Sequence, residues 1–258
     1  MPSPRPSLSV VIITLNCAPQ LAACLDSVAF AEEILLIDSG SNDGTVELAQ
    51  KWTHKRGVRV VHQDWLGFGK QKQSGVEQAS HDWVLCIDSD ERVTPELKAS
   101  IEEALATPSF QAYRFARSNR FMGRYLRHGE GYPDWSLRLF HRAHARWSDD
   151  VVHEKVLVQQ AVGTLRGDLL HDTAENLETY LAKQNRYTTL AAESALASGR
   201  RATPAHLLLS PLLRFVKFYF VRLGLLDGLP GLAHIAIGCH NSFIKYAKML
   251  DLQREKYK

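Results

Sequence analysis

The sequence predicts an α/β fold with an open, mostly parallel β-sheet, and three observations lead to this prediction. Four short apolar, β-branched runs alternate with segments that have the spacing of a helix. Only short polar connections separate them, as in units of strand, helix and parallel strand. Polar side chains also gather directly after three of the runs, where such sheets bind their ligands.

The elements are expected in a regular order. Strands are predicted at residues 8–14, 33–37, 58–62 and 83–87, and helices at residues 18–27, 46–55 and 68–79. Thr45 or Asp43 can cap the second of these helices. After Pro95 the alternation weakens, and we expect longer-range strands at residues 113–117 and 137–141.

Three polar clusters follow expected strands at their carboxyl ends. They are Thr14-Leu15-Asn16, Asp38 to Asp43, and Asp88 to Glu91. The carboxyl ends of neighbouring parallel strands lie at one edge of a sheet, so these clusters should converge although they are far apart in the sequence. A single crevice at this edge is the predicted ligand site.

Asp88 and Asp90 place two carboxylates two residues apart after a buried apolar strand. Alternate side chains of an extended segment point to the same side, so both acids would face the crevice. Paired oxygen ligands suit a hard divalent cation such as Mg²⁺ or Mn²⁺, which commonly also binds substrate phosphates. The alternative is a solvated turn with a helix cap that leads into Thr94-Pro95-Glu96. The two other polar clusters favour the metal site.

The loop IDSGSNDGT is the second polar signal. Its glycines permit positive φ and close backbone approach, and Asp38 can accept hydrogen bonds from a base or a ribose. No Gly-Lys-Ser/Thr follows, which excludes a P-loop, and G-x-G-x-x-G is absent, which excludes a dinucleotide fingerprint. The alternative is an ordinary turn with a helix cap.

Four segments together resemble family 2 glycosyltransferases of the GT-A fold. They are SVVIITLN, LLIDSGSNDGT, GFGKQKQSGVEQA and VLCIDSDE, in the order and spacing of that family. The resemblance implies a Rossmann-like, mostly parallel sheet with helices on both faces, followed here by a C-terminal helical extension. It also implies a nucleotide-sugar donor and a divalent metal, Mg²⁺ or Mn²⁺, on the donor's diphosphate.

The resemblance assigns roles to single residues. Thr14 and Asn16 match the loop beside the nucleotide, and Asp38 matches the acid that recognises the base or the ribose. Asp88 is expected to face the ribose and the metal, and Asp90 to ligate the metal.

The segment over the uracil side is matched by Gly67, Gly69 and Lys72. Two positions depart from the family. Gln73 stands where the family often has Asn, and Ser39 stands where many members have a second Asp.

The middle of the chain narrows the resemblance. GYPDWSLRLFHR, WSDDVVHEKV and LLHDTAENLETYLAKQNRY resemble segments of the glucosyltransferases that build the inner core of bacterial lipopolysaccharide or lipooligosaccharide. Those enzymes add a β-linked glucose to a heptose of the core. The resemblance therefore implies an inverting hexosyltransferase with a UDP-glucose donor and a lipid A-linked heptose acceptor. Gly129-Glu130-Gly131 stands where an aromatic residue is expected.

An inverting transfer needs a base that deprotonates the acceptor hydroxyl, and a carboxylate is the usual choice. Glu154 is the first candidate, with Asp150 and Asp134 in reserve. The alternative for Glu154 is a surface ion pair with Lys155.

The remaining polar residues of the middle segment are assigned to the metal and the phosphates. His171 is expected to be a third metal ligand, with a structural histidine as the alternative. Arg138 is expected to pair with a diphosphate or an acceptor phosphate through its planar fork, or else with Asp134. Tyr132, Asp134 and His153 complete the expected acceptor and phosphate contacts.

The C-terminal part is expected to be helical, beginning with a long helix at residues 177–197. After it, PAHLLLSPLLRFVKFYFVRLGLLDGLPGL interleaves Leu and aromatic residues with Arg214, Lys217 and Arg222. Pro211 is expected to break or start a helix. Basic amphipathic segments of this kind lie in anionic membrane interfaces. The alternative is a helical hairpin packed on the catalytic core.

We therefore expect two domains. Residues 1–176 form the GT-A catalytic domain, with a nucleotide-sugar half at 1–95 and an acceptor half at 96–176. Residues 177–258 form a helical region that associates with a membrane.

Composition agrees with a globular cytosolic protein. The chain has 258 residues, of which 45% are hydrophobic, and its net charge of +3 does not indicate nucleic acid as a partner. The four cysteines have no C-x-x-C or zinc spacing and are expected to be reduced and mostly buried.

There is no uncharged apolar run long enough to span a membrane, and the N-terminal MPSPRPS does not resemble a signal peptide. We expect a cytoplasmic protein, peripheral on the inner face of the bacterial inner membrane.

Three alternatives remain open at this point. One is a family 2 enzyme with another donor, or with a polyprenyl or polysaccharide acceptor. Another is a nucleotide-sugar-binding protein with a degenerate site. The last is a nucleotidyltransferase, although the Gly-rich basic loop that it needs after the first strand is absent.

Overall fold

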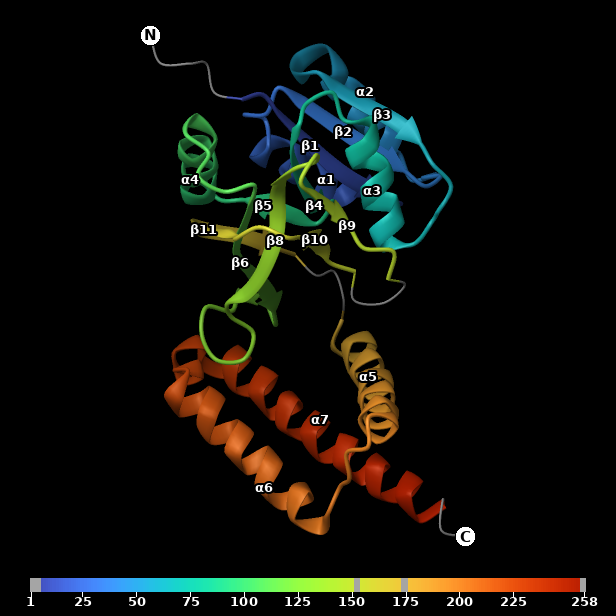
Figure 1. Ribbon diagram of the computed structural model, residues 1–258, viewed down its shortest axis with the longest axis vertical. Coiled ribbons are helices and arrows are strands. Elements are labelled where there is room, and N and C mark those ends of the chain that lie inside the picture. The colour runs from blue at the N-terminus through green and yellow to red at the C-terminus, as the bar shows by residue number, and fades with distance from the viewer. Residues whose placement is uncertain (1–5, 151–153, 173–175, 256–258) are drawn as a thin grey trace. The chain divides into compact units, whose positions relative to one another are not determined.

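Two compact units make up the chain (Figure 1). The structure is a computed structural model that describes residues 6–150, 154–172 and 176–255, without the side chains of residues 53–56 and 255. Unit 1 comprises Met1–Arg117 and Asp134–Asp172, and unit 2 comprises Ser118–Pro133 and Thr173–Lys258. The units divide at residue 172 and assign residues 118–133 to the C-terminal unit. The functional division at residue 176 stays a prediction.

Four parallel strands form one side of the sheet in unit 1. Strand β1 (Leu8–Thr14) lies between β2 (Glu33–Asp38) and β4 (Trp83–Asp88), and β3 (Val58–His62) lies outside β2. Every residue of β1 and β2 is buried, which is why these strands are apolar throughout rather than alternating. The predicted parallel α/β sheet is confirmed.

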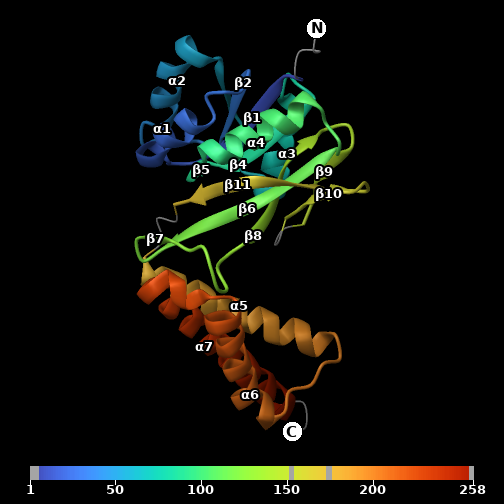
Figure 2. The same ribbon diagram turned by 90° about the vertical axis from the view of Figure 1, so that its left-hand side faces the viewer.

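Helices cover both faces of this sheet (Figures 1 and 2). One face packs against α1 (Ala18–Ser27), α2 (Thr45–Arg56) and α4 (Pro95–Ala106). The other face packs against α3 (Phe68–Gln78). Alternate residues of β1 divide between the two cores because side chains of a strand alternate in direction. The first core takes Leu8, Val10 and Ile12, and the second takes Val11 and Ile13.

Antiparallel strands extend the sheet beyond β4. The order continues with β8, β6, β11 and β5, and a separate hairpin joins β9 to β10. Their bounds are β5 Glu91–Val93, β6 Ala112–Phe121, β8 Asp134–His141, β9 Ala145–Trp147, β10 Val156–Val158 and β11 Gly163–His171. The strands predicted at 113–117 and 137–141 are therefore longer than expected. Strands β5, β9, β10 and β11 were not predicted. The first three have only three residues each, which are too few to show an alternation.

Unit 2 is mainly helical in the residues that the structure describes. The last residues of β6 pair with β7 (Arg124–Tyr125). Helix α5 (Leu177–Ala197) has the predicted bounds. It is followed by α6 (Pro204–Phe215), the π-helical η1 (Val216–Val221), the 3₁₀ turn η2 (Gly224–Asp227) and α7 (Gly228–Glu255).

The role predicted for Pro211 is wrong. Helix α6 begins at Pro204, where a missing N–H has no consequence, and Pro211 lies inside the helix rather than at an end. Helix α6 packs against α7 along its length. Ser210 Oγ lies 2.8 Å from Ser242 Oγ of α7 at this position.

The Gly129-Glu130-Gly131 segment is packed against α6, η2 and α7 within unit 2. The Glu130 carboxylate accepts from Arg214 Nε at 3.0 Å. A Cβ at Gly129 would lie 3.1 Å from Gly224 Cα, and one at Gly131 would lie 2.7 Å from Leu126 Cδ1. Close approach therefore explains why this chain has glycines where an aromatic residue was expected.

In the described residues, no helix by itself has both the length and the hydrophobicity to cross a bilayer. One pair meets the requirement only jointly, Pro204–Val221 with Gly224–Arg254, and these two segments meet at a bend of 74°.

Candidate functional site

The predicted polar clusters lie at the carboxyl ends of β1, β2 and β4. Thr14 is paired with Asp38 across β1 and β2, and Ile13 is paired with Asp88 across β1 and β4. Ligands of open α/β sheets bind at this edge. The register therefore brings the three clusters together as expected.

Asp38 shapes the loop that follows β2. Its buried carboxylate accepts hydrogen bonds from Thr14 Oγ1 at 3.0 Å, from the N–H groups of Gly40 and Ser41, and from Ser41 Oγ. Burial alone would raise the pKa of Asp38, but the hydrogen bonds from Ser41, Thr14 and Gly40 outweigh it and lower the pKa. The carboxylate is thus fully engaged within the protein.

Asn16 joins the first loop to the second. It adopts a positive φ of 50°, its backbone N–H donates to Ser41 Oγ, and its side-chain oxygen accepts from the N–H of Asn42. Asp43 accepts from the N–H of Ala18 in the same way. These contacts fix an exposed polar rim beside the carboxyl ends of β1 and β2.

Lys72 lies at the centre of a charge cluster. Its side chain is only 2% exposed, and its Nζ lies 3.1 Å from Asp88 Oδ1 and 3.4 Å from Glu154 Oε1. The contact to Asp88 Oδ1 is an ion pair without hydrogen-bond geometry. Burial would raise the pKa of Asp88, but Lys72 and Arg138 outweigh it and hold this pKa well below its usual range. Glu154 is therefore paired with a buried lysine and not, as in the alternative, with its neighbour Lys155.

Arg138 contacts Asp88 from the other side. Its Nη2 lies 3.3 Å from Asp88 Oδ2 and 3.7 Å from the fully buried Glu91. Burial would lower the pKa of Arg138, but Glu91 and Asp88 raise it. The alternative pairing of Arg138 with Asp134 is wrong, because Asp134 is held by Arg117 at 2.7 Å.

Trp147 covers the two cations. Lys72 Nζ lies 4.9 Å and Arg138 Cζ lies 5.3 Å from the Trp147 ring. The indole Nε1 donates to Cys86 Sγ, and the Trp147 backbone N–H donates to the side-chain oxygen of Gln73 at 3.0 Å. An aromatic face stabilises a desolvated cation, so Trp147 supports a cluster that would otherwise be costly to bury.

Two glycines of the expected nucleotide segment have different roles. Gly67 precedes α3 with φ +94° and ψ 155°, a conformation that essentially only glycine adopts. A Cβ at Gly69 would lie 2.4 Å from the Ser148 carbonyl oxygen and 3.2 Å from Glu154 Cβ. The missing side chain at Gly69 lets α3 approach the segment that carries Glu154.

The expected metal ligands are only partly assembled. His171 Nε2 lies 3.4 Å from Asp90 Oδ2, whereas Asp88 faces Lys72 and Arg138. In the described ranges no group of three or more His, Cys, Asp or Glu side chains is close enough to hold a metal ion. Asp90 lies in a turn directly after β4, so the extended segment that was expected to run from Asp88 to Asp90 is not formed. Asp90 and His171 offer one oxygen ligand and one nitrogen ligand. Two such ligands fit a divalent cation if phosphate groups supply the rest of its coordination.

The structure describes two of the three remaining expected residues. Asp150 is exposed, and His153 lies outside the described residues. Tyr132 belongs to unit 2, where its carbonyl oxygen accepts from Arg222 at 3.1 Å.

Some residues of the site were missed or underrated. Glu91 was noted only as part of an acidic cluster, yet it accepts from the Asp88 N–H and pairs with Arg117 and Arg138. Gln71 is fully buried and donates to Ser39 Oγ and to the Gln63 carbonyl oxygen. Gln71 could have been predicted from the sequence as a polar residue on the inward face of the expected helix.

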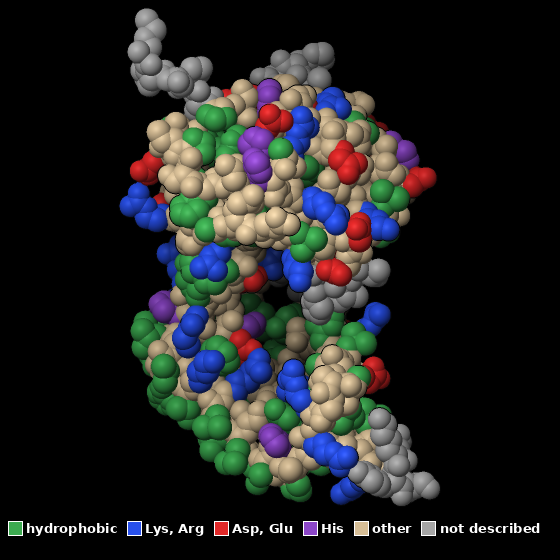
Figure 3. Space-filling view, in the orientation of Figure 1, with side chains coloured by type: hydrophobic (Ala, Val, Ile, Leu, Met, Phe, Trp, Pro, Cys, Tyr) green, Lys and Arg blue, Asp and Glu red, His purple; other side chains and the backbone are tan. Residues whose placement is uncertain are grey.

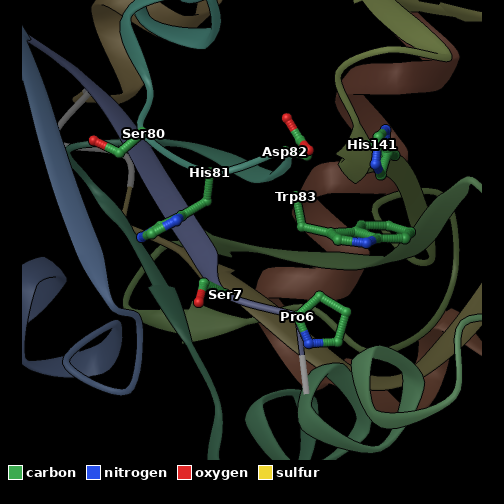
Figure 4. Close-up of a pocket in the computed structure, with 7 residues that line it drawn as sticks. All are labelled: Pro6, Ser7, Ser80, His81, Asp82, Trp83 and His141. Atoms are coloured by element: carbon green, nitrogen blue, oxygen red, sulfur yellow. The ribbon is translucent and has the colours of Figure 1, made fainter. Parts of the chain in front are cut away.

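A cavity of about 340 Å³ lies at the opposite edge of the sheet (Figure 4). It is lined by Pro6, Ser7, Ser80, His81, Asp82, Trp83 and His141. These residues adjoin the amino ends of β1 and β4 and include none of the polar clusters. Because ligands of such sheets bind at the carboxyl ends, we place the candidate site there and not in this cavity.

Comparison with known proteins gives a consistent result. The family model for glycosyl transferase family 2 matches residues 9–162. The lipopolysaccharide core biosynthesis glycosyltransferase LpsC of Rhizobium meliloti (strain 1021) is 33% identical over 95% of this chain and 93% of its own. An uncharacterized glycosyltransferase of Rickettsia typhi is 25% identical over 95% of this chain and 87% of its own.

Solved structures share the fold. The mannosyltransferase PcManGT from Pyrobaculum calidifontis, in complex with GDP-Man and Mn²⁺, has a TM-score of 0.56 at 18% identity and covers 96% of this chain and 88% of its own. TarS 1–349 of S. aureus in complex with UDP-GlcNAc has a TM-score of 0.51 at 15% identity and covers 90% of this chain and 79% of its own. Both support the GT-A type of sheet predicted from the sequence.

Proposed function

The chain belongs to glycosyl transferase family 2, and from this premise we propose that it transfers glucose from UDP-glucose to a heptose of the lipopolysaccharide core. The transfer inverts the anomeric configuration. The similarity to LpsC along nearly the whole chain supports a core acceptor. TarS and PcManGT, which were solved with nucleotide sugars, support a donor of that class.

One observation supports the proposal most. Glu154 and Asp88 are far apart in the sequence, yet both carboxylates lie within 3.4 Å of Lys72 Nζ. The candidate base is therefore next to the strand end at which we expect the donor diphosphate. A transferase needs this proximity, because attack and departure take place at one carbon.

In the proposed reaction, Glu154 accepts the proton of the acceptor hydroxyl as its oxygen attacks the anomeric carbon. The bond from this carbon to the diphosphate oxygen breaks, and UDP leaves with the electron pair. A single displacement inverts the configuration and forms no covalent intermediate with the enzyme. The resemblance assigns Lys72 to the uracil side of the donor. Because Lys72 contacts both Asp88 and Glu154, we propose that it also adds a fixed positive charge beside the departing group.

Asp90 and His171 would hold the divalent cation, Mg²⁺ or Mn²⁺. When bound, the cation would offset the charge that develops on the leaving diphosphate. Asp88 is expected to contact the ribose side of the donor, and Asp38 is expected to keep the nucleotide loop in shape through its four hydrogen bonds. We also propose that the enzyme works on the cytoplasmic face of the inner membrane, where a lipid A-linked acceptor is available.

Nucleotide release tests the proposal. Purified protein is incubated with Mg²⁺ or Mn²⁺, a panel of nucleotide sugars and heptose-terminated core lipid, and the released nucleotide is measured. We expect release from UDP-glucose that depends on the acceptor and falls at least about a hundredfold in Asp90→Ala.

The other outcomes separate the parts of the proposal. Release from a different nucleotide sugar would refute UDP-glucose as the donor but would still support transferase activity. Absence of release with tight UDP binding would point to another acceptor or to a binding protein. Absence of UDP binding would refute the nucleotide site.

A further inference from the structure

Helix α6 and the π-helical η1 expose their apolar side. We call this the apolar stripe, and it consists of Leu208, Leu209, Leu212, Leu213, Val216, Phe220 and Val221. These residues recur three or four positions apart, so they share one side of the helix. Leu208 is 74% exposed and Val221 is 72% exposed, and neither α6 nor η1 has a buried residue. A helix of a water-soluble domain normally turns such a side toward the core.

The exposed apolar surface continues beyond η1 over the turn into α7. Leu225, Leu226 and Leu229 are exposed there, whereas the neighbouring Gly224 and Asp227 are buried. About half of the exposed large hydrophobic side chains in the described part of the chain lie between Leu208 and Phe243. A contiguous surface of this kind indicates an interaction site.

The charges around the apolar stripe are of one sign. Residues 204–250 contain five Lys or Arg residues and a single acid, Asp227. Asp227 is 1% exposed, and it accepts hydrogen bonds from the N–H groups of Arg127 and His128. Lys217 and Arg222 are exposed beside the stripe. Figure 3 shows Lys and Arg side chains next to the hydrophobic margin of α6.

We propose that the apolar stripe docks into the surface of an anionic phospholipid bilayer, with Lys217 and Arg222 at the level of the lipid headgroups. Leu and aromatic side chains enter the boundary of the acyl chains, and cations beside them meet phosphate groups. The inference rests on the proposed function only in that a lipid-linked acceptor brings the enzyme to a bilayer.

A second copy of the chain fits this surface less well. Stripe-to-stripe pairing would bring two sets of cations together without an exposed acid within residues 204–250 to offset them. An anionic membrane supplies both the apolar interior and the opposite charge. The bend of 74° between the two helical segments suits a hairpin lying in the interface better than a straight span.

Flotation with vesicles tests the docking surface. The full chain is mixed with vesicles of phosphatidylcholine alone or of phosphatidylcholine with phosphatidylglycerol. We expect binding to the anionic vesicles, weakened by high salt because salt screens the cations. The double variant Leu212→Asp with Val221→Asp should bind roughly tenfold or more weakly. Lys217→Glu should lose about fivefold or more, and on anionic vesicles only.

Leu157→Asp in β10 is the matched control, since Leu157 is an exposed leucine of unit 1, outside the stripe. It should float like the wild type. Transfer to a soluble, delipidated heptose oligosaccharide should be unchanged in the double variant, which separates loss of docking from loss of fold or of the proposed activity.

Unchanged flotation of the double variant would overturn the proposal. The proposal would also be overturned if the wild type did not bind vesicles but formed a dimer in solution, and if the double variant were monomeric. That result would assign the stripe to self-association. A milder pair, Leu212→Ser with Val221→Ser, should show a smaller loss in the same direction. This pair keeps the test valid if the aspartates impair folding.

Discussion

Lys72 carries its charge into a nearly closed environment, between Asp88 and Glu154 and over the Trp147 ring. Such a lysine is stable only while its partners remain, because an unpaired buried charge is expensive. The cluster therefore couples the strand end at Asp88 to the loop of Glu154. At the level of single residues, the proposed reaction depends on which carboxylate removes the proton of the acceptor hydroxyl.

Glu154→Gln should lower kcat by roughly a hundredfold or more while UDP binding stays close to that of the wild type. The amide keeps the shape of the side chain but cannot accept a proton. Steady-state release of UDP gives kcat, and calorimetric titration gives the affinity for UDP.

Asp150→Asn is the matched control, since Asp150 is an exposed acid four residues before Glu154. It should retain wild-type kcat. An inactive Asp150→Asn together with an active Glu154→Gln would move the base to Asp150.

Helix α3 is the element that assembles the site. Gly75 allows it to lie on the sheet, where a Cβ would be 2.3 Å from Val11 Cγ1. Gly69 allows the segment at Ser148 and Glu154 to approach on another side. Lys72 lies between these glycines in the sequence and so reaches both the strand end and the loop. The helix has a glycine wherever a neighbouring backbone or strand must come close.

Gln73→Asn should lower the free energy of unfolding by about 1–3 kcal/mol. The shorter amide cannot reach the Trp147 N–H, which Gln73 now satisfies at 3.0 Å, and a partly buried donor is left without its partner. Denaturant unfolding monitored by tryptophan fluorescence measures the change.

Gln78→Ala is the control for this prediction, because Gln78 is an exposed residue of the same helix. Its effect should stay within about 0.5 kcal/mol. Equal stability of Gln73→Asn and the wild type would show that water or another group satisfies Trp147.

The stability of unit 1 also involves contacts at the amino edge of the sheet, away from the candidate site. Glu33 joins several segments there, accepting from Ser9 Oγ at 2.5 Å, from Ser80 N at 2.7 Å and from Arg59 Nη2 at 3.0 Å. Burial alone would raise the pKa of Glu33, but the bonds from Ser9, Ser80 and Arg59 outweigh it and lower the pKa from 4.5 to about 2.

Stability should therefore depend on pH through Glu33. A carboxylate with a lowered folded-state pKa stabilises the fold above its unfolded-state pKa, and this contribution is lost as the pH falls. The shift corresponds to a contribution on the order of 3 kcal/mol. The advantage of the wild type over Glu33→Gln should be largest near neutral pH and should decline between pH 4.5 and about 2.

Denaturant unfolding of both proteins across this range measures the difference, and other carboxylates cancel because both proteins carry them. A difference that does not change with pH would mean that Glu33 acts by shape rather than by charge.

Much of this protein follows from local pattern. Strands at residues 8–14 and 58–62 and the helix at 177–197 have the predicted bounds. A continuous apolar run or a helical spacing of apolar residues can be recognised within a few neighbouring residues. The order of the four motifs likewise predicts the edge at which Thr14, Asp38 and Asp88 meet.

The partners of the charged side chains do not follow from local pattern. Nothing near Glu154 in the sequence indicates Lys72, and nothing near Arg138 indicates Glu91 and Asp88 rather than Asp134. An ion pair depends on distance through space, and for Arg138 and Asp88 the antiparallel pairing of β8 with β4 brings the two side chains together.

The sequence alone determined the family, the parallel half of the sheet and the edge that carries the site, because periodicity and turn chemistry are local properties. Tertiary structure decided that Asp88 is held by two cations, that Asp90 lies beside His171, and that α6 turns its leucines outward. These features depend on segments that are distant along the chain, and only packing determines which of them meet and which face remains uncovered.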